Sequence, residues 1–283
     1  MTAELSLRSI LSQTRLPLNE ARILLAHVLD KHYQLPRSAI HSKDDLAING
    51  AAFLEWQELE SKRLAGHPIA YLVGKKGFHN IELTVGPGVL IPRPETELLV
   101  EIGLRQIAQL KQTRSIPKIL DLGTGSGAIA LAIANADSEV GVTATDQSLE
   151  ALAIAQKNAA LLNLTARIRF AQGNWYEALN PQERFDIILS NPPYITKQDP
   201  HLLQGDLRFE PLTALTDQAD GLTCLQRIIE GASSFLTPKG FIAVEHGFDQ
   251  SLAVIKMMQS AGFSEIQAHQ DLSGHQRVVS ARK

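Results

Sequence analysis

Residues 118–136, KILDLGTGSGAIALAIANA, are the strongest indication of an α/β fold in this chain. A short apolar strand, KILDL, runs through a glycine-rich turn into the apolar helix SGAIALAIANA. The alternation continues downstream, with strands expected at VGVTATD (140–146), IRFAQG (168–173) and FDIILS (185–190) and a helix capped by Ser148. Strands alternating with helices of this length predict a mostly parallel, doubly wound α/β sheet covered on both faces.

The C-terminal part of the chain ends this pattern. A strand is expected at FIAVEH, residues 241–246, followed by a helix at 250–261. Two last strands are expected near 264–269 and 277–281, and no helix lies between them. Because a short connection joins antiparallel strands, these two predict a C-terminal antiparallel hairpin.

The N-terminal part differs in its periodicity. Residues 1–70 show helical spacing, with Asn19 expected as the cap of one helix and apolar side chains up to Leu64 near one face of another. Glycines and prolines punctuate short β-like runs in residues 71–92, which predicts a β-hairpin linker. We therefore expect a small N-terminal helical domain, this linker, and an α/β domain over residues 93–283.

The composition restricts the classes of function. The 283 residues contain 27 Lys and Arg against 30 Asp and Glu, a net charge of −3, which argues against a protein held on nucleic acid mainly by phosphate contacts. No apolar run approaches the roughly 20 residues that span a bilayer, and the first residues do not resemble a secretory signal. The single cysteine, Cys224, suits a reducing compartment, and the nine histidines lack metal-ligand spacing. We expect a cytoplasmic protein without membrane attachment or metal.

The glycine-rich turn suggests a nucleotide-like ligand. Gly123, Gly125 and Ala128 satisfy the loose dinucleotide pattern, whereas Asp121 followed by G-x-G-x-G is typical of S-adenosylmethionine-dependent methyltransferases. Asp146 ends the next strand, where its carboxylate can accept hydrogen bonds from both hydroxyls of a ribose. The alternatives are a tight structural turn and an acidic helix cap, and Asp146 does not distinguish the two cofactors.

The stretch SNPPY, residues 190–194, favours methyl transfer to nitrogen. The carboxamide oxygen of Asn191 and the main-chain carbonyl of Pro192 can each accept one N–H of a planar –NH₂ group. This directs the nitrogen towards a methyl donor, and Tyr194 can cover the planar group. A proline-rich loop without chemistry is the alternative. Trp175, after the third strand, is a candidate surface for adenine or an ordinary core tryptophan.

Four segments together are more selective. LIPRPETELLVE (90–101), DLGTGSGAIA (121–130), NPPYI (191–195) and FEPLTALTDQADGL (209–222) resemble the peptide-chain release factor glutamine methyltransferase family, the PrmC/HemK type, over nearly the whole chain. The resemblance implies a Rossmann-like class I methyltransferase sheet with S-adenosylmethionine as cofactor. It implies that the glutamine in the Gly-Gly-Gln loop of class I peptide chain release factors is methylated. Because such a loop offers little contact area, and residues 1–70 balance eight Lys and Arg against eight Asp and Glu, we expect the N-terminal helical domain to dock the release factor; a packed helical domain without a docking role is the alternative.

The resemblance also implies site residues. Asn191 and Pro192 would be catalytic, and the substrate contacts would be Asn191, Pro192, Pro193 and Tyr194. The cofactor contacts would be Gly123, Thr124, Gly125, Ser126, Gly127, Asp146, Trp175 and Asn191.

One departure and several alternatives stay open. Asn174 stands where the family often has an acidic residue, and Arg93, Glu95 and Glu97 could form a wall of the site or a structural ion-pair cap. An adenine-specific nucleic-acid methyltransferase, an NAD-dependent oxidoreductase and a ribosome-associated binding module are the competing functions. The first normally needs a basic groove, the second leaves the NPPY segment unused, and the third needs neither motif.

Overall fold

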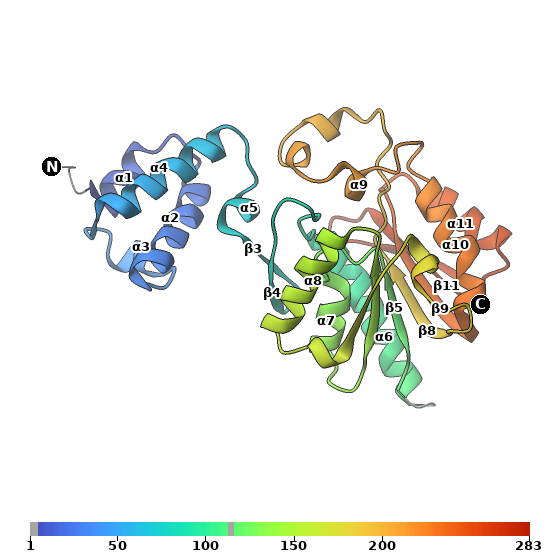
Figure 1. The fold of residues 1–283 in the computed structure, drawn as a ribbon. Helices are drawn as coiled ribbons and strands as arrows, with labels where there is room; N and C mark the ends of the chain where they lie inside the picture. Colours follow the sequence, from blue (N-terminus) through green and yellow to red (C-terminus); the bar gives the residue numbers. More distant parts are fainter. Residues whose placement is uncertain (1–4, 113–115) are drawn as a thin grey trace. The chain divides into compact units, whose positions relative to one another are not determined.

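The computed structural model describes residues 5–112 and 116–283 and divides the chain into two compact units (Figure 1). One unit comprises Met1–Lys75 with Leu203–Phe209, and the other comprises Lys76–Leu202 with Glu210–Lys283. We call them the helical unit and the α/β unit. The segment 203–209 therefore packs with the helical unit although the chain on both sides of it belongs to the α/β unit.

The helical unit is held together by a small apolar core. Its elements are β1 (Leu5–Ser6), α1 (Leu7–Gln13), α2 (Leu18–Tyr33), α3 (Ala39–Ser42), β2 (Ala47–Ile48), α4 (Gly50–Leu64) and α5 (Ile69–Val73). The core contains Leu24, Leu25, Val28 and Leu29 of α2, at the spacing that places side chains on one helix face, and Trp56 of α4. The predicted helical character of this region is confirmed.

Two details of the predicted helices are wrong. Asn19 does not cap α2, because the carbonyl of Pro17 already accepts the first helical hydrogen bond, from Ala21 N at 3.0 Å, and the helix begins at Leu18. Leu64, expected on the buried face of α4, is 41% exposed because it is the last residue of the helix, with Ala65 as the C-cap. Gly66 follows with φ +96°, as expected of a helix stop.

The α/β unit is built on a seven-stranded sheet. The strands are β5 (Ile119–Leu122), β6 (Val142–Asp146), β7 (Ile168–Gln172), β8 (Phe185–Ser190), β9 (Leu236–Glu245), β10 (Ser264–Gln270) and β11 (Gln276–Arg282). Their order across the sheet is β10-β11-β9-β8-β5-β6-β7. β9, β8, β5, β6 and β7 run parallel to one another, and β11 is antiparallel to both β9 and β10. The predicted mostly parallel sheet and C-terminal hairpin are both confirmed.

Helices cover both faces of this sheet (Figure 1). The helices are α6 (Glu97–Lys111), α7 (Ala128–Ala136), α8 (Leu149–Leu161), α9 (Leu212–Leu215), α10 (Thr223–Phe235) and α11 (Ser251–Ser260). Side chains of α6, α7 and α8 share one apolar cluster with Ile187 and Leu189, whereas those of α10 and α11 share a second with Ile188. Because successive strand residues point to opposite faces, one strand supplies both cores.

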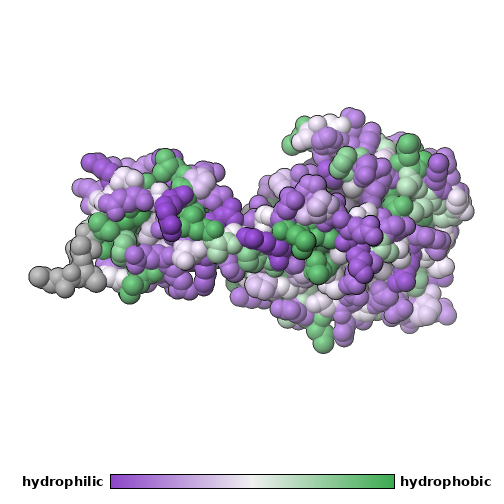
Figure 2. All heavy atoms as spheres, turned by 90° about the horizontal axis from the view of Figure 1, so that it is seen from above, coloured by the Kyte–Doolittle hydropathy of each residue, from purple (hydrophilic) through white to green (hydrophobic). Residues whose placement is uncertain are grey.

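Two shorter elements lead into this unit. β3 (Lys75–Phe78) and β4 (Ile81–Thr84) pair with each other as the predicted hairpin. A single 3₁₀ turn at Pro94–Thr96 then begins α6. On the face seen in Figure 2, hydrophobic residues are interspersed with hydrophilic ones. None of the helices in the described parts of the chain is long and apolar enough to cross a membrane.

Candidate active site

A cavity opens in the α/β unit where β5, β6 and β8 end. Its volume is about 930 Å³ when the space open to solvent is included. This is the carboxyl edge of a parallel sheet, where open α/β proteins bind ligands. Of the residues expected to bind cofactor or substrate, the cavity is lined by Gly123, Thr124, Gly125, Ser126, Asp146, Trp175, Asn191 and Pro193.

The glycine turn is shaped by its backbone. Gly123, Gly125 and Gly127 have φ values of +72°, +56° and +86°, in the left-handed region that favours glycine. At Gly123 there is also a spatial reason, since a Cβ would lie 3.2 Å from the ring of Trp175. Gly127 belongs to the turn but does not line the cavity. The tight turn therefore brings bare backbone to the cavity wall beside an aromatic ring.

Asp121 holds this turn from behind. Its carboxylate is fully buried, and its Oδ2 accepts hydrogen bonds from Thr124 Oγ1 at 2.6 Å and Ala130 N at 3.2 Å. The Oδ1 atom is buried without a hydrogen-bond partner. Burial raises the pKa of Asp121 to about 7, against the two hydrogen bonds that lower it. Asp121 thus organises the turn without lining the cavity.

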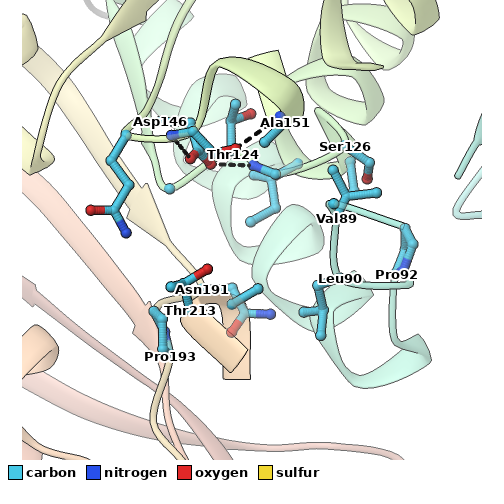
Figure 3. Close-up of a pocket in the computed structure, with 18 of the residues that line it drawn as sticks. Val89, Leu90, Pro92, Thr124, Ser126, Asp146, Ala151, Asn191, Pro193 and Thr213 are labelled. Atoms are coloured by element: carbon cyan, nitrogen blue, oxygen red, sulfur yellow. Dashed lines mark hydrogen bonds between the residues drawn. The ribbon is translucent and has the colours of Figure 1, made fainter. Parts of the chain in front are cut away.

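Asp146 presents its carboxylate to the cavity (Figure 3). Its Oδ2 accepts from Gly125 N and its Oδ1 from Ser148 N, both at 2.9 Å. Burial raises the pKa of Asp146, and these backbone hydrogen bonds oppose the shift. The following helix is capped by Ser148, whose hydroxyl accepts from Ala151 N, so Asp146 is not the cap of α8. Each oxygen keeps a lone pair with which it can accept a hydroxyl of a ligand.

Trp175 lies between the cavity and the protein core. It opens the short 3₁₀ helix Trp175–Ala178 with φ +53°, an unusual value for a side chain of this size. Its ring lines the cavity beside Gly123 and also packs against the apolar cluster of α10 and α11. The ring therefore lies at the cavity, as expected of a surface for adenine, and also packs in the core, as expected of an ordinary core tryptophan. Asn174, the departure from the family pattern, lines the same wall.

The NPPY segment follows β8 and reaches the cavity from the side opposite Asp146 (Figure 3). Asn191 and Pro193 line the cavity, and Asn191 Nδ2 donates to Thr96 Oγ1 at 3.0 Å. Pro192 is buried, and the Tyr194 hydroxyl donates to Glu245 Oε1 at 3.1 Å. Pro192 and Tyr194 do not line the cavity, so their roles towards a substrate stay predictions.

In one wall of the cavity, Arg93 alone was named as a candidate from the sequence. This wall is formed by the chain just before α6, including Val89, Leu90, Pro92 and Arg93, and by Thr213 and Ala214 (Figure 3). Buried Glu210 ties these two segments together, since it accepts from Ile91 N at 2.9 Å and from Arg93 Nη2. Apart from Val89, these residues lie in the stretches 90–101 and 209–222, which carry the family resemblance, so the sequence marked both segments although it pointed to Arg93 alone as a wall residue.

The three charged residues of the first of these segments have different positions. Arg93 lines the cavity. Glu97 instead accepts a hydrogen bond from His79 N at 2.9 Å and so holds the β3–β4 hairpin. Glu95 does not line the cavity either. Arg93 therefore has both of the expected roles, since it lines the cavity wall and forms an ion pair with Glu210. Glu97 has a structural role. In the described parts of the chain no cluster of His, Cys, Asp and Glu could hold a metal ion.

The residues around the cavity fit S-adenosylmethionine. The glycine turn and Trp175 line the same cavity side by side, Asp146 can accept hydrogen bonds from the hydroxyls of a ribose, and Arg93 can face a carboxylate. The fold and this cavity define a class I methyltransferase, with S-adenosylmethionine as the methyl donor. The Methyltransferase small domain family matches residues 99–205, and the PrmC N-terminal domain family matches residues 6–74. The chain belongs to the release factor glutamine methyltransferase family.

Similar proteins cover almost the whole chain. It is 47% identical to the release factor glutamine methyltransferase of Bordetella pertussis over 272 residues, 96% of this chain and 97% of that protein. It is 43% identical to the release factor glutamine methyltransferase of Burkholderia pseudomallei over 267 residues, 93% of this chain and 91% of that protein. A methyltransferase structure from Pyrococcus furiosus shares the fold, with a TM-score of 0.54, 19% identity, and coverage of 80% of this chain and 98% of that one.

Proposed function

We propose that this protein transfers a methyl group to the side-chain amide nitrogen of the glutamine in the Gly-Gly-Gln motif of class I peptide chain release factors. The observation that carries the proposal is the placement of Asn191 and Asp146 at opposite sides of one cavity (Figure 3). A nucleoside-binding carboxylate and a segment suited to a planar –NH₂ group then face the same space. The names of the relatives agree, since they are release factor glutamine methyltransferases.

The chemistry asked of the protein is orientation of a poor nucleophile. An amide nitrogen shares its lone pair with the carbonyl, so it attacks slowly unless it is held in a reactive geometry. In the proposed complex the carboxamide oxygen of Asn191 and the carbonyl of Pro192 accept the two N–H groups and direct the lone pair towards the donor. Bound S-adenosylmethionine supplies an electrophilic methyl group. As the N–C bond formed, the methyl–sulfur bond would break and S-adenosylhomocysteine would leave as a neutral thioether. The methylated nitrogen is acidic and its extra proton is released to water, so no strong base is needed.

We assign each part of the cofactor to residues around the cavity. We assign the ribose to Asp146, the backbone approach to Gly123, Thr124, Gly125, Ser126 and Gly127, and the adenine side to Trp175. The charge on Arg93 suits the carboxylate of the methionine part. Asn191 then stands between cofactor and substrate, which is where a residue that orients the acceptor nitrogen must lie.

We assign docking of the release factor to the helical domain, residues 1–70. A loop glutamine offers little contact area, so recognition needs surface beyond the cavity. This region contains eight Lys and Arg and eight Asp and Glu, a balance that suits a protein surface better than a phosphate backbone. Leu18, Leu54 and Leu64 expose 51%, 65% and 41% of their surface there. A release factor as substrate implies that the enzyme acts in the cytoplasm.

The activity is tested by incubating the full-length protein with S-adenosylmethionine and intact release factor, followed by peptide mass spectrometry. We expect a mass gain of one methylene on the Gly-Gly-Gln peptide and none on other glutamine peptides. Methylation of adenine in DNA or RNA, with the release factor unmodified, would overturn the proposal.

Docking is tested separately with Leu54→Glu, a change on the exposed face of α4. We expect a lower kcat/KM on intact release factor and an unchanged value on a short Gly-Gly-Gln peptide. The same change is made at Leu18 and at Leu64. If all three glutamate variants keep the wild-type kcat/KM on intact release factor, these positions do not take part in docking. Deleting the helical domain is a poorer test, because segment 203–209 packs with it.

A further inference from the structure

A side-chain amide outside the cavity contacts the end of the NPPY segment. The Nε2 atom of Gln250 donates to the carbonyl oxygen of Tyr194 at 2.9 Å and to that of Gly221 at 3.3 Å. The Oε1 atom of Gln250 accepts from Gly247 N at 2.8 Å. This partly buried side chain therefore joins the NPPY segment to the stretch 209–222 and to the turn after β9, and it does not line the cavity.

The orientation of this amide is determined by its partners. Tyr194 and Gly221 present carbonyl oxygens, which can only accept, and Gly247 presents a main-chain N–H, which can only donate. One orientation of the Gln250 amide satisfies all three groups. In the flipped orientation –NH₂ would face N–H, and the amide oxygen would face both carbonyls, so all three hydrogen bonds would be lost.

The space around Gln250 suits this contact. Gly221 has φ +80°, and a Cβ there would lie 2.4 Å from the Tyr194 carbonyl oxygen and 2.9 Å from Gln250 Nε2. A Cβ at Gly247 would lie 3.0 Å from Gln250 Oε1. Gln250 occupies the N-cap position of α11, yet its side chain makes no capping hydrogen bond. Both ends of the amide are therefore used between loops, and glycines leave the room for them.

The NPPY segment is held at its other end by the sheet. Ser190, the last residue of β8, pairs in register with Leu122, and its hydroxyl donates to the Leu122 carbonyl at 2.7 Å. Beyond it, the rings of Pro192 and Pro193 fix φ and remove the N–H, so neither proline can donate a main-chain hydrogen bond. The course of the segment therefore depends on what holds its two ends, the strand on one side and Tyr194 on the other.

We infer that Gln250 is a positioning residue for methyl transfer, which holds the Tyr194 carbonyl and with it the course of the segment that brings Asn191 and Pro193 to the cavity. The inference rests on the proposed function and deepens it. A group that orients a nucleophile is effective only while it keeps its place, and a displacement of about 1 Å can cost about 100-fold in rate. Without Gln250, the Tyr194 carbonyl loses its donor and the end of the segment is free to shift.

The kinetic experiment compares two variants of the full chain, with S-adenosylmethionine and intact release factor as substrates. Gln250→Met keeps the length of the side chain and removes all three hydrogen bonds. Gln250→Glu keeps the shape and, when ionised, only the bond from Gly247 N. At about pH 8 we expect both variants to lower kcat about 10- to 100-fold, with KM for the release factor nearly unchanged. Wild-type kcat in Gln250→Met would overturn the inference.

Lowering the pH separates the missing donor from general damage. A protonated carboxyl in Gln250→Glu again has an O–H to donate to the Tyr194 carbonyl, and the facing carbonyl oxygens favour this protonated form. The ratio of variant to wild-type kcat should rise from about pH 8 to about pH 6 for Gln250→Glu and stay constant for Gln250→Met. The nearby titratable groups Asp217, His246 and Asp249 are present in all three proteins, so the ratio removes their effect. A ratio for Gln250→Glu that does not rise would overturn the inference.

Asn158 provides the matched control, because its amide makes the same kind of contact on the cofactor side of the cavity. It is 1% exposed, its Nδ2 donates to the carbonyls of Ser126 at 2.9 Å and Thr84 at 3.0 Å, and its Oδ1 accepts from Thr84 N at 2.7 Å. In calorimetry, Asn158→Asp should weaken S-adenosylmethionine binding about 10-fold, whereas both Gln250 variants should bind it as the wild type does. An equal loss of affinity in Gln250→Met would show a general effect on the site, and the inference would fall.

Hydrogen exchange measures the placement of the segment without any turnover. Ile195 N, directly after the NPPY segment, donates to the Leu215 carbonyl at 3.0 Å, and Gly123 N in the glycine turn donates to the Thr145 carbonyl at 2.9 Å. In Gln250→Met we expect the Ile195 amide to exchange at least about 10-fold faster and the Gly123 amide to exchange at the wild-type rate. Unchanged exchange at Ile195 would overturn the inference.

The two proposals fail in different ways. A wild-type enzyme that does not methylate the release factor defeats the proposed function, and exchange at Ile195 then decides whether Gln250 holds the segment. A wild-type enzyme that does methylate it, combined with full kcat in Gln250→Met, defeats only the positioning role.

Discussion

Replacing Asp146 by alanine tests the cofactor site most directly. Each carboxylate oxygen already accepts one backbone N–H, from Gly125 and Ser148, and keeps a lone pair for one ribose hydroxyl. Hydrogen bonds to a charged acceptor contribute about 1.5–3 kcal/mol each, and part of this is retained by water in the variant. Asp146→Ala should therefore weaken binding by about 2–4 kcal/mol, which corresponds to a roughly 30- to 1000-fold higher Kd.

The assay is calorimetric titration with S-adenosylmethionine, with thermal unfolding measured in parallel. Asp271→Ala is the matched control, because Asp271 also accepts two backbone N–H groups, from Ser273 and His275, in a turn away from the cavity. We expect cofactor affinity to be unchanged in this control. Wild-type affinity in a folded Asp146→Ala protein would refute the assignment, and an equal loss in both variants would show a general effect of removing a turn carboxylate.

Three further outcomes follow from the geometry. Asn191→Ala should lower kcat by about 10²–10³ and change release-factor binding much less, because it removes an oriented acceptor; steady-state kinetics with normal turnover would leave Asn191 structural. Gly221→Ala should destabilise the protein by about 1–3 kcal/mol and slow turnover, since Gly221 has φ +80° and a Cβ would lie 2.4 Å from the carbonyl oxygen of Tyr194; wild-type melting and turnover would contradict this. Burial raises the pKa of Glu245 to about 7. The folded protein therefore holds a proton that the unfolded chain releases. This contribution to the stability is present at low pH and disappears as the pH rises from about 5 to about 7. Urea unfolding of Glu245→Gln should show a stability less dependent on pH in this window, by up to about 1.4 kcal/mol per pH unit, and identical slopes for variant and wild type would contradict the shift.

Local patterns of the sequence predict much of the fold. The alternation of apolar strands and helices from residue 118 onward predicts the parallel sheet, because burial on both faces demands apolar runs of that length. The missing helix before residues 277–281 predicts the antiparallel strand β11 in the same way. A local capping preference can be overridden by a neighbouring residue. Asn19 was expected to cap α2, but the carbonyl of Pro17 accepts the first helical hydrogen bond, so Asn19 lies inside the first turn.

The candidate active site also contains residues that the sequence reveals and partners that it does not reveal. Gly123, Asp146 and Asn191 are recognisable in the sequence, because a strand followed by a ligand-contacting turn leaves a short motif at one place in the chain. The partners of these residues are not, because they come from segments far apart in the chain. Thr96, which accepts from Asn191, is 95 residues from it, and Glu245, which accepts from Tyr194, is 51 residues away. Which hydroxyl meets which carboxylate depends on how β8, β9 and the start of α6 pack together, and no local pattern records that arrangement. The sequence therefore determines which chemistry is present at the sheet edge, and tertiary packing decides how its donors and acceptors are turned.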